Sequence, residues 1–161
     1  MESWKIGFIG AGNMATAIIN GILSSGHYQK EQIGIYDIST ERQQYYSEKG
    51  IRIYEDVPTL TQESDVIFLA VKPQNVNTVL PDMKTVFSPE KIIVSIAAGI
   101  GAAHIKKMIG FDCKVVLTAP NTPLLLGEGA VALCHIPPVT DEEYQMVCDM
   151  FLGAGIVETV P

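Results

Sequence analysis

The stretch KIGFIGAGNMATAIINGIL, residues 5–23, decides the fold of this chain. Its first five residues, Lys5–Ile9, predict a short strand that ends at Gly10. Beyond the glycines, apolar and small residues recur at the spacing of one helix face, at Met14, Ala17, Ile18, Gly21 and Ile22. A strand, a glycine turn and a helix in this order begin a βαβ unit.

The turn has the form Gly10-x-Gly12-x-x-Ala15, which is typical of dinucleotide-binding proteins when it follows a strand and opens a helix. Gly10 allows the tight turn, and Ala15 keeps the helix close to the strand. A Cβ at Gly12 would collide with a pyrophosphate, and a positive φ is a second expectation there. Asp37, 25 residues beyond Gly12, is placed to accept hydrogen bonds from the hydroxyls of an adenosine ribose.

Strands and helices alternate along the rest of the chain. Further strands are predicted over Ile33–Tyr36, Ile51–Tyr54, Val66–Val71, Ile92–Ile96, Lys114–Leu117, Ala130–Cys134 and Ile156–Val160. Helices are predicted from Ser39 toward Lys49, over Pro58–Glu63, within Pro73–Val86, over Ala102–Met108 and after the capping-box sequence Thr140–Glu143. We therefore expect one α/β domain over residues 1–161. Its fold would be a Rossmann-type, doubly wound, mostly parallel sheet with helices on both faces.

Unusual residues follow five of the predicted strands. Because parallel strands end at the same edge of a sheet, these loops should converge on one site. The loops are Gly10–Asn13, Asp37–Ser39, Lys72–Asn75, Ala97–Gly99 and Pro120–Pro123. A purely structural domain would not need glycines, prolines and small amides at all of them.

Composition limits the possible functions. The 161 residues carry a net charge of −7 and are 47% hydrophobic, which excludes a disordered acidic chain and does not suggest binding to nucleic acid. A mean hydropathy of +0.22 suggests apolar surface meant for a partner or for further sequence. Three cysteines, Cys113, Cys134 and Cys148, have neither disulfide nor metal spacing and predict small buried side chains in a reducing compartment. Without a signal peptide or a membrane-length apolar run, we expect a soluble, cytoplasmic protein.

Five motifs taken together resemble Δ1-pyrroline-5-carboxylate reductase. They are GFIGAGNMATAIINGIL (7–23), AVKPQ (70–74), SIAAGI (95–100), APNTP (119–123) and GEGAVAL (127–133). The resemblance implies hydride transfer from NADPH or NADH to the C=N bond of 1-pyrroline-5-carboxylate, giving L-proline. It also implies that this chain is the cofactor-binding domain. The family's helical C-terminal domain, which forms a homodimer or larger homo-oligomer and supplies much of the substrate pocket, would be absent.

The resemblance also implies roles for matching positions. The pyrophosphate would contact Gly10, Ala11, Gly12, Asn13, Met14 and Ala15, and Ser39 would approach the adenosine ribose or its 2′-phosphate. Asp56 stands where the family often has an asparagine near the adenosine ribose. The nicotinamide half would be lined by Ala70, Val71, Lys72, Pro73, Ile96, Ala97 and Ala98, with Asn121 and Thr122 near the carboxamide and the substrate. Leu117 and Ala119 stand where the family usually has arginine and methionine, and no catalytic residue is assigned.

Several alternatives stay open on the sequence. Lys72 is either a solvated loop lysine or a contact made mainly through its backbone, and Asn121 either braces its loop or meets the cofactor. Asp37 favours NADH, whereas Ser39, Thr40 and Arg42 could bind a 2′-phosphate, so we expect use of both cofactors. The chain could instead be a non-catalytic dinucleotide-binding module. It could also belong to another Rossmann dehydrogenase acting on imines or β-hydroxyacids.

Overall fold

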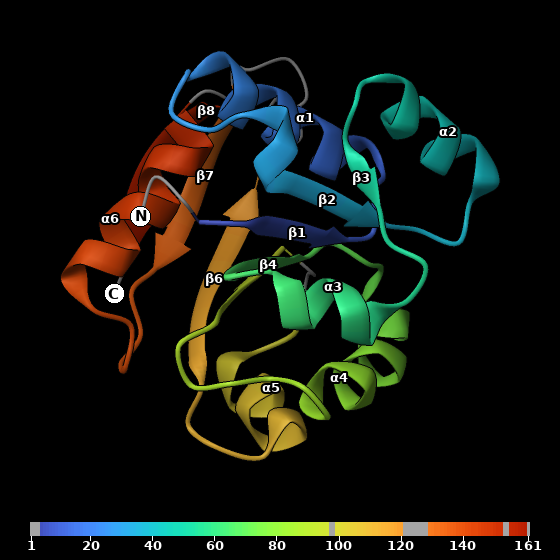
Figure 1. Ribbon diagram of the computed structural model, residues 1–161. Coiled ribbons are helices and arrows are strands. Elements are labelled where there is room, and N and C mark those ends of the chain that lie inside the picture. The colour runs from blue at the N-terminus through green and yellow to red at the C-terminus, as the bar shows by residue number, and fades with distance from the viewer. Residues whose placement is uncertain (1–3, 97–98, 121–128, 153–154, 161) are drawn as a thin grey trace.

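A computed structural model describes residues 4–96, 99–120, 129–152 and 155–160. Within them, eight strands form one sheet in the order β3-β2-β1-β4-β5-β6-β7-β8 (Figure 1). The strands are β1 (Ile6–Ile9), β2 (Ile33–Tyr36), β3 (Arg52–Ile53), β4 (Val66–Leu69), β5 (Ile92–Ser95), β6 (Lys114–Pro120), β7 (Gly129–Cys134) and β8 (Gly155–Val160). The helices are α1 (Asn13–Ser24), α2 (Thr40–Glu48), α3 (Val57–Glu63), α4 (Val76–Lys84), α5 (Ala102–Ile109) and α6 (Asp141–Leu152), with short 3-10 turns η1 (Lys30–Gln32) and η2 (Pro73–Asn75).

The first six strands are parallel, which confirms the predicted doubly wound, mostly parallel sheet. β1 lies between β2 and β4, so the strand order reverses beside β1. We call the edge at which the six parallel strands end the carboxyl edge and the opposite edge the amino edge. In sheets of this kind, ligands bind where the order reverses at the carboxyl edge.

The last two strands run the other way. β7 pairs with β6 antiparallel, and β8 pairs with β7 in parallel after the α6 crossover. β6 continues three residues beyond its predicted end at Leu117, because it gains β7 as a partner as far as Pro120. β8 therefore runs toward the amino edge, but its last residue, Val160, lies level with Cys134, Leu117 and Ser95, where the parallel strands end.

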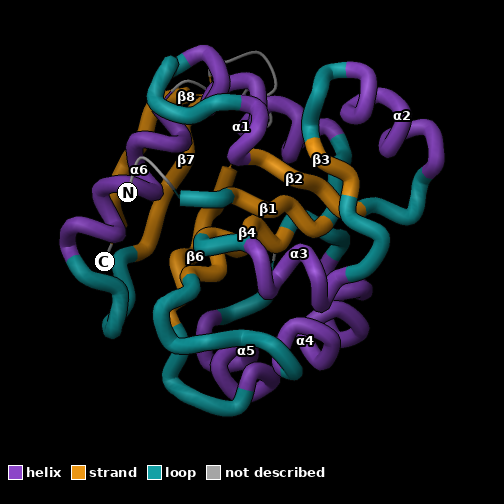
Figure 2. Tube along the Cα trace, in the orientation of Figure 1, coloured by secondary structure: helices purple, strands orange, loops and turns teal. Residues whose placement is uncertain are grey.

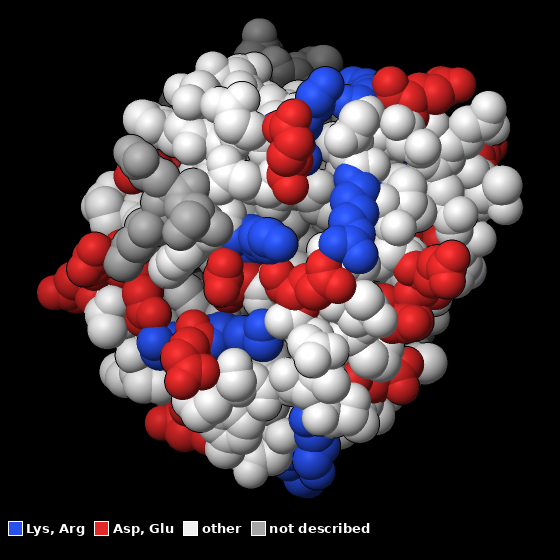
Figure 3. All heavy atoms as spheres, viewed as in Figure 1, with Lys and Arg blue, Asp and Glu red and all other residues white. Residues whose placement is uncertain are grey.

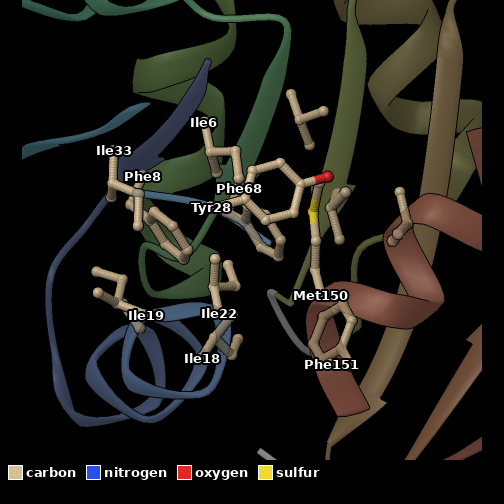
Figure 4. Packing of buried hydrophobic residues seen from close by; sticks show 14 of the residues in the cluster. Ile6, Phe8, Ile18, Ile19, Ile22, Tyr28, Ile33, Phe68, Met150 and Phe151 are labelled. Atoms are coloured by element: carbon tan, nitrogen blue, oxygen red, sulfur yellow. The ribbon is translucent and has the colours of Figure 1, made fainter. Parts of the chain in front are cut away.

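Helices cover both faces of the sheet, as the tube view makes clear (Figure 2). Side chains of the central strands alternate between two buried clusters, as the two-residue period of a strand requires. One cluster joins Phe8 and Phe68 to α1, α2 and α6, and its stacked phenyl rings have centroids 4.4 Å apart (Figure 4). The other joins Ile9 and Leu69 to α3, α4 and α5. This packing fixes β1 and β4, and therefore the loops that follow them.

Two predicted helix starts are confirmed by their hydrogen bonds. Ser39 caps α2, because its Oγ accepts the N–H of Arg42. Thr140 and Glu143 form the predicted capping box before α6, each binding the other's main-chain N–H. Lys114 on β6 also donates to Glu143 at 2.6 Å. Burial opposes ionisation of Glu143, but these hydrogen bonds outweigh it and hold its pKa below the ordinary value.

The prediction of buried cysteines is confirmed at two of the three positions. Cys113 and Cys148 are buried, as predicted, and burial raises the pKa of both thiols; Cys134 is half-buried. Figure 3 shows Lys and Arg intermixed with Asp and Glu across the face it presents. Among the described residues, no group of three His, Cys, Asp or Glu side chains could hold a metal ion, and no helix is long and apolar enough to span a membrane.

Candidate functional site

The first glycine of the turn is required by the protein itself. Gly10 has φ +97°, and its N–H donates to the carbonyl of Tyr36 at 2.8 Å. A Cβ on Gly10 would lie 2.6 Å from the carbonyl oxygen of Ala70, in the loop that follows β4. Gly10 therefore allows β1 and β4 to end side by side, and any other residue would be both strained and overlapping.

The second glycine is not required by the protein. Gly12 has φ −76°, so the expected positive φ is wrong at this position; Gly10 adopts it instead. A Cβ on Gly12 would have nothing within 4 Å among the described atoms. Gly12 is the N-cap residue of α1 and offers no side-chain cap, and the first turn of the helix carries no acidic residue. Open space beside an uncapped helix N-terminus fits an anionic group such as a pyrophosphate.

Asp37 links the glycine turn to the loop after β2. Its Oδ2 accepts the N–H of Ala11 and its Oδ1 accepts the N–H of Ser39, both at 2.8 Å. The Asp37 carbonyl accepts a hydrogen bond from the side chain of Gln43. A carboxylate oxygen can accept more than one bond, so these contacts still leave room for a ribose hydroxyl. Asp37 thus sets the spacing of the two loops, a role that the sequence did not predict.

A second polar link joins the start of α1 to α2. The Arg42 guanidinium donates from Nη2 to Oδ1 of Asn13 at 2.8 Å, which joins α2 to the first residue of α1. Deeper in, the buried Tyr46 hydroxyl meets Oγ1 of Thr16, which donates to the Gly12 carbonyl. Burial, ahead of the other effects, raises the pKa of Tyr46, so its phenol stays protonated and donates to Thr16.

The remaining residues predicted to contact the pyrophosphate or the adenosine ribose lie in the first turn of α1 and before α3. Met14 is half-buried and Ala15 is buried in the first turn of α1. Asp56 follows β3 and caps α3 by accepting the Thr59 N–H at 2.7 Å. The hydrogen bonds from Thr59 hold the pKa of the exposed Asp56 below its ordinary value. Asp56 is therefore an ionised carboxylate at the carboxyl edge, and its role toward a cofactor stays a prediction.

On the other side of β1, main-chain bonds position the predicted residues. The Ala70 N–H donates to the Ile9 carbonyl at 2.8 Å, and the Ile96 N–H donates to the Leu69 carbonyl at 3.1 Å. Ala70, Val71 and Ile96 are half-buried, whereas Lys72 and Pro73 are exposed. Ala97, Ala98, Asn121 and Thr122 lie outside the described residues. The half-buried residues on this side are apolar, which suits the face of an aromatic ring.

The structure also shows residues that the sequence analysis missed. Ile38, between Asp37 and Ser39, is 87% exposed, which is unusual for a large apolar side chain. The links from Asn13 to Arg42 and from Thr16 to Tyr46 join residues about 30 positions apart. In the sequence, the one signal for these residues was Ile38 itself, an apolar residue inside an otherwise polar loop.

Comparisons with known proteins find a matching family model, matching relatives and matching solved structures. A family model described as "NADP oxidoreductase coenzyme F420-dependent" matches residues 5–99. The chain is 33% identical to the pyrroline-5-carboxylate reductase of Methanosarcina acetivorans, over all of this chain and 60% of that protein. A Coxiella burnetii pyrroline-5-carboxylate reductase structure superposes with a TM-score of 0.94 at 28% identity, covering 99% of this chain and 59% of that one.

A second solved structure carries a ligand. Pyrroline carboxylate reductase of Plasmodium falciparum, described with NADP bound, matches with a TM-score of 0.87 at 30% identity. The match covers 100% of this chain and 59% of that chain. The chain therefore spans about three fifths of the length of the relatives it matches.

Proposed function

The chain belongs to the family described as NADP oxidoreductase coenzyme F420-dependent, and we propose that its carboxyl edge binds the nicotinamide dinucleotide of a pyrroline-5-carboxylate reductase. The observation that carries the proposal is the space at Gly12. Neither its φ of −76° nor any neighbour within 4 Å of its Cβ position requires glycine there. A ligand that packs against the main chain at this position would explain why it is glycine.

The pyrophosphate would lie against Gly12 and the first turn of α1. The unpaired N–H groups of that turn and the positive end of the helix dipole favour a doubly charged group. The adenosine half would extend over the loop from Asp37 to Ser39, where Ile38 offers an apolar surface to the base. Asp37 and Ser39 stay predictions as ribose contacts.

The nicotinamide half would lie over Ala70, Val71 and Ile96. When bound, the dinucleotide supplies a hydride, and the relatives named pyrroline-5-carboxylate reductase support a cyclic imine as its acceptor. The chain's own residues would then orient the ring and exclude water from its face. Half-buried apolar side chains suit this work, because they offer the ring a surface without competing hydrogen bonds.

Residues beyond the length of this chain would complete the substrate pocket. The chain spans about 60% of its relatives, so we place the proton donor to the imine nitrogen, and the contacts between subunits, in the remaining part. Residues 1–161 would act as the cofactor-binding domain. No described side chain is assigned to catalysis.

Two measurements on the purified chain test this proposal. Titration with NADPH and NADH should shift the fluorescence of the reduced nicotinamide, while ATP should compete weakly because it lacks the second nucleoside. Addition of 1-pyrroline-5-carboxylate should give no steady oxidation of NADPH. Failure to bind either dinucleotide would overturn the assignment of the site. Robust turnover would show that the 161 residues already hold the whole catalytic apparatus.

A further inference from the structure

We propose that Asn13 is a positioning residue that holds Arg42 where it recognises the 2′-phosphate of NADPH. The inference rests on the proposed function, because it assigns a selective role within the same site. Its basis is the hydrogen bond from Arg42 Nη2 to Asn13 Oδ1 at 2.8 Å. This bond connects the first residue of α1 with the third residue of α2 across the end of β1 and β2.

Arg42 is anchored at both of its ends. Its main-chain N–H donates to Oγ of Ser39, which caps α2, and its guanidinium donates to Asn13. An arginine on a surface helix normally samples many rotamers, so a fixed guanidinium needs a partner. Asn13 supplies this partner through a neutral amide oxygen, which leaves the positive charge of Arg42 uncompensated by the bond.

Asp37, the carboxylate directly after β2, is engaged elsewhere. Both oxygens of Asp37 accept main-chain N–H groups, from Ala11 and Ser39, and no ion pair between Asp37 and Arg42 is formed among the described residues. A guanidinium has five N–H donors in a planar fork, and Asn13 uses one of them. The others suit a phosphate, which such a fork can bind through two bonds.

This arrangement separates two kinds of dinucleotide. NADH has hydroxyls where NADPH has a phosphate, so an oriented arginine strengthens the binding of NADPH alone. The main-chain N–H of Asn13 would still face the pyrophosphate, which the two cofactors share, and Asn13→Ala keeps this group. If the Asn13 side chain also contacted the pyrophosphate, its loss would weaken both cofactors equally. The ratio of the two affinities therefore distinguishes positioning of Arg42 from direct contact or from a general effect on the fold.

The test is a double-mutant cycle on Asn13 and Arg42. NADPH and NADH are titrated at one ionic strength into the wild type, Asn13→Ala, Arg42→Ala and the double variant. Asn20→Ala is the matched control, because Asn20 is an exposed asparagine on the same helix. Arg42→Ala should weaken NADPH by about tenfold, because a charge-assisted hydrogen bond to the phosphate is removed. Asn13→Ala should weaken it by about threefold, because that bond is only loosened, and NADH should change by less than about twofold in every variant.

The double variant decides the mechanism. It should bind NADPH no more weakly than Arg42→Ala, because Asn13 has no arginine left to position. A further loss in the double variant, an equal loss of NADH, or no effect of Asn13→Ala would each overturn the inference while the proposed function stands. A wild type that binds neither dinucleotide would overturn both.

Discussion

The two halves of the carboxyl edge are held by different means. Beside β1 and β2, side chains set the geometry: Asp37 binds two main-chain N–H groups, and Arg42 binds Asn13. Beside β4 and β5, main-chain bonds continue the sheet pairing through Ala70 and Ile96. The first half can therefore distinguish ligands by charge and hydrogen bonding, while the second mainly offers them a surface shaped by the main chain. Substitutions should alter which dinucleotide binds in the first half, and should be tolerated in the second while the backbone stays in place.

The junction between the halves should be the most sensitive point. Gly10→Ala places a Cβ 2.6 Å from the Ala70 carbonyl oxygen at a φ of +97°. We expect a loss of about 3 kcal/mol in the free energy of unfolding, the sum of backbone strain and displaced neighbours, measured by urea denaturation. Gly12→Ala is the control and should cost at most about 1 kcal/mol, since its Cβ enters open space. Similar losses for both variants would mean that the two halves do not meet at Gly10.

Asp37→Asn tests whether side chains hold the first half. The amide has one acceptor oxygen, so either the Ala11 or the Ser39 N–H loses its partner. We expect a loss of about 2 kcal/mol in unfolding free energy, and hydrogen exchange at these two amides should accelerate. An unchanged stability would indicate that main-chain bonds suffice on this side as well. The control is Asp82→Asn on the exposed side of α4, which should be neutral.

Gly12→Val tests the shared part of the site. A branched side chain would fill the space assigned to the pyrophosphate, so NADPH and NADH should both weaken by more than tenfold, about 1.4 kcal/mol. The unfolding transition should move little, because nothing lies within 4 Å of the Cβ position. Fluorescence titration of both dinucleotides gives the answer, and unchanged affinities would leave the glycine turn with a structural role only.

Lys72→Ala should have the smallest effect. Its side chain is exposed, and the loop is shaped by main-chain bonds such as that from the Asn75 N–H to the Lys72 carbonyl. We expect a change of less than about twofold in the affinity for either dinucleotide, which corresponds to a solvated or backbone-only role. A tenfold loss would show that the second half also selects by charge, and the comparison between the halves would fail.

Periodicity and turn chemistry explain what could be predicted from the sequence. Alternating apolar strands and capped helices predict the α/β fold, and the glycine turn predicts where the site lies. The direction of β7 and β8 could not be predicted, because a strand's period of two is the same in parallel and antiparallel pairs. The partners of Asp37 and Arg42 were also missed, since they depend on rotamers and on loops about 26 to 29 positions apart.

The start of β1 also determines how this domain could be handled on a surface or in a sensor. β1 begins at the amino edge, so Trp4 lies on the side away from Gly12, whereas β8 ends level with Cys134, Leu117 and Ser95, near the carboxyl edge. A fluorescent protein or an immobilisation tether fused before Trp4 would start roughly one strand length, about 15–20 Å, from the dinucleotide. The domain could therefore be anchored on its N-terminal side while its binding edge stays open to solution.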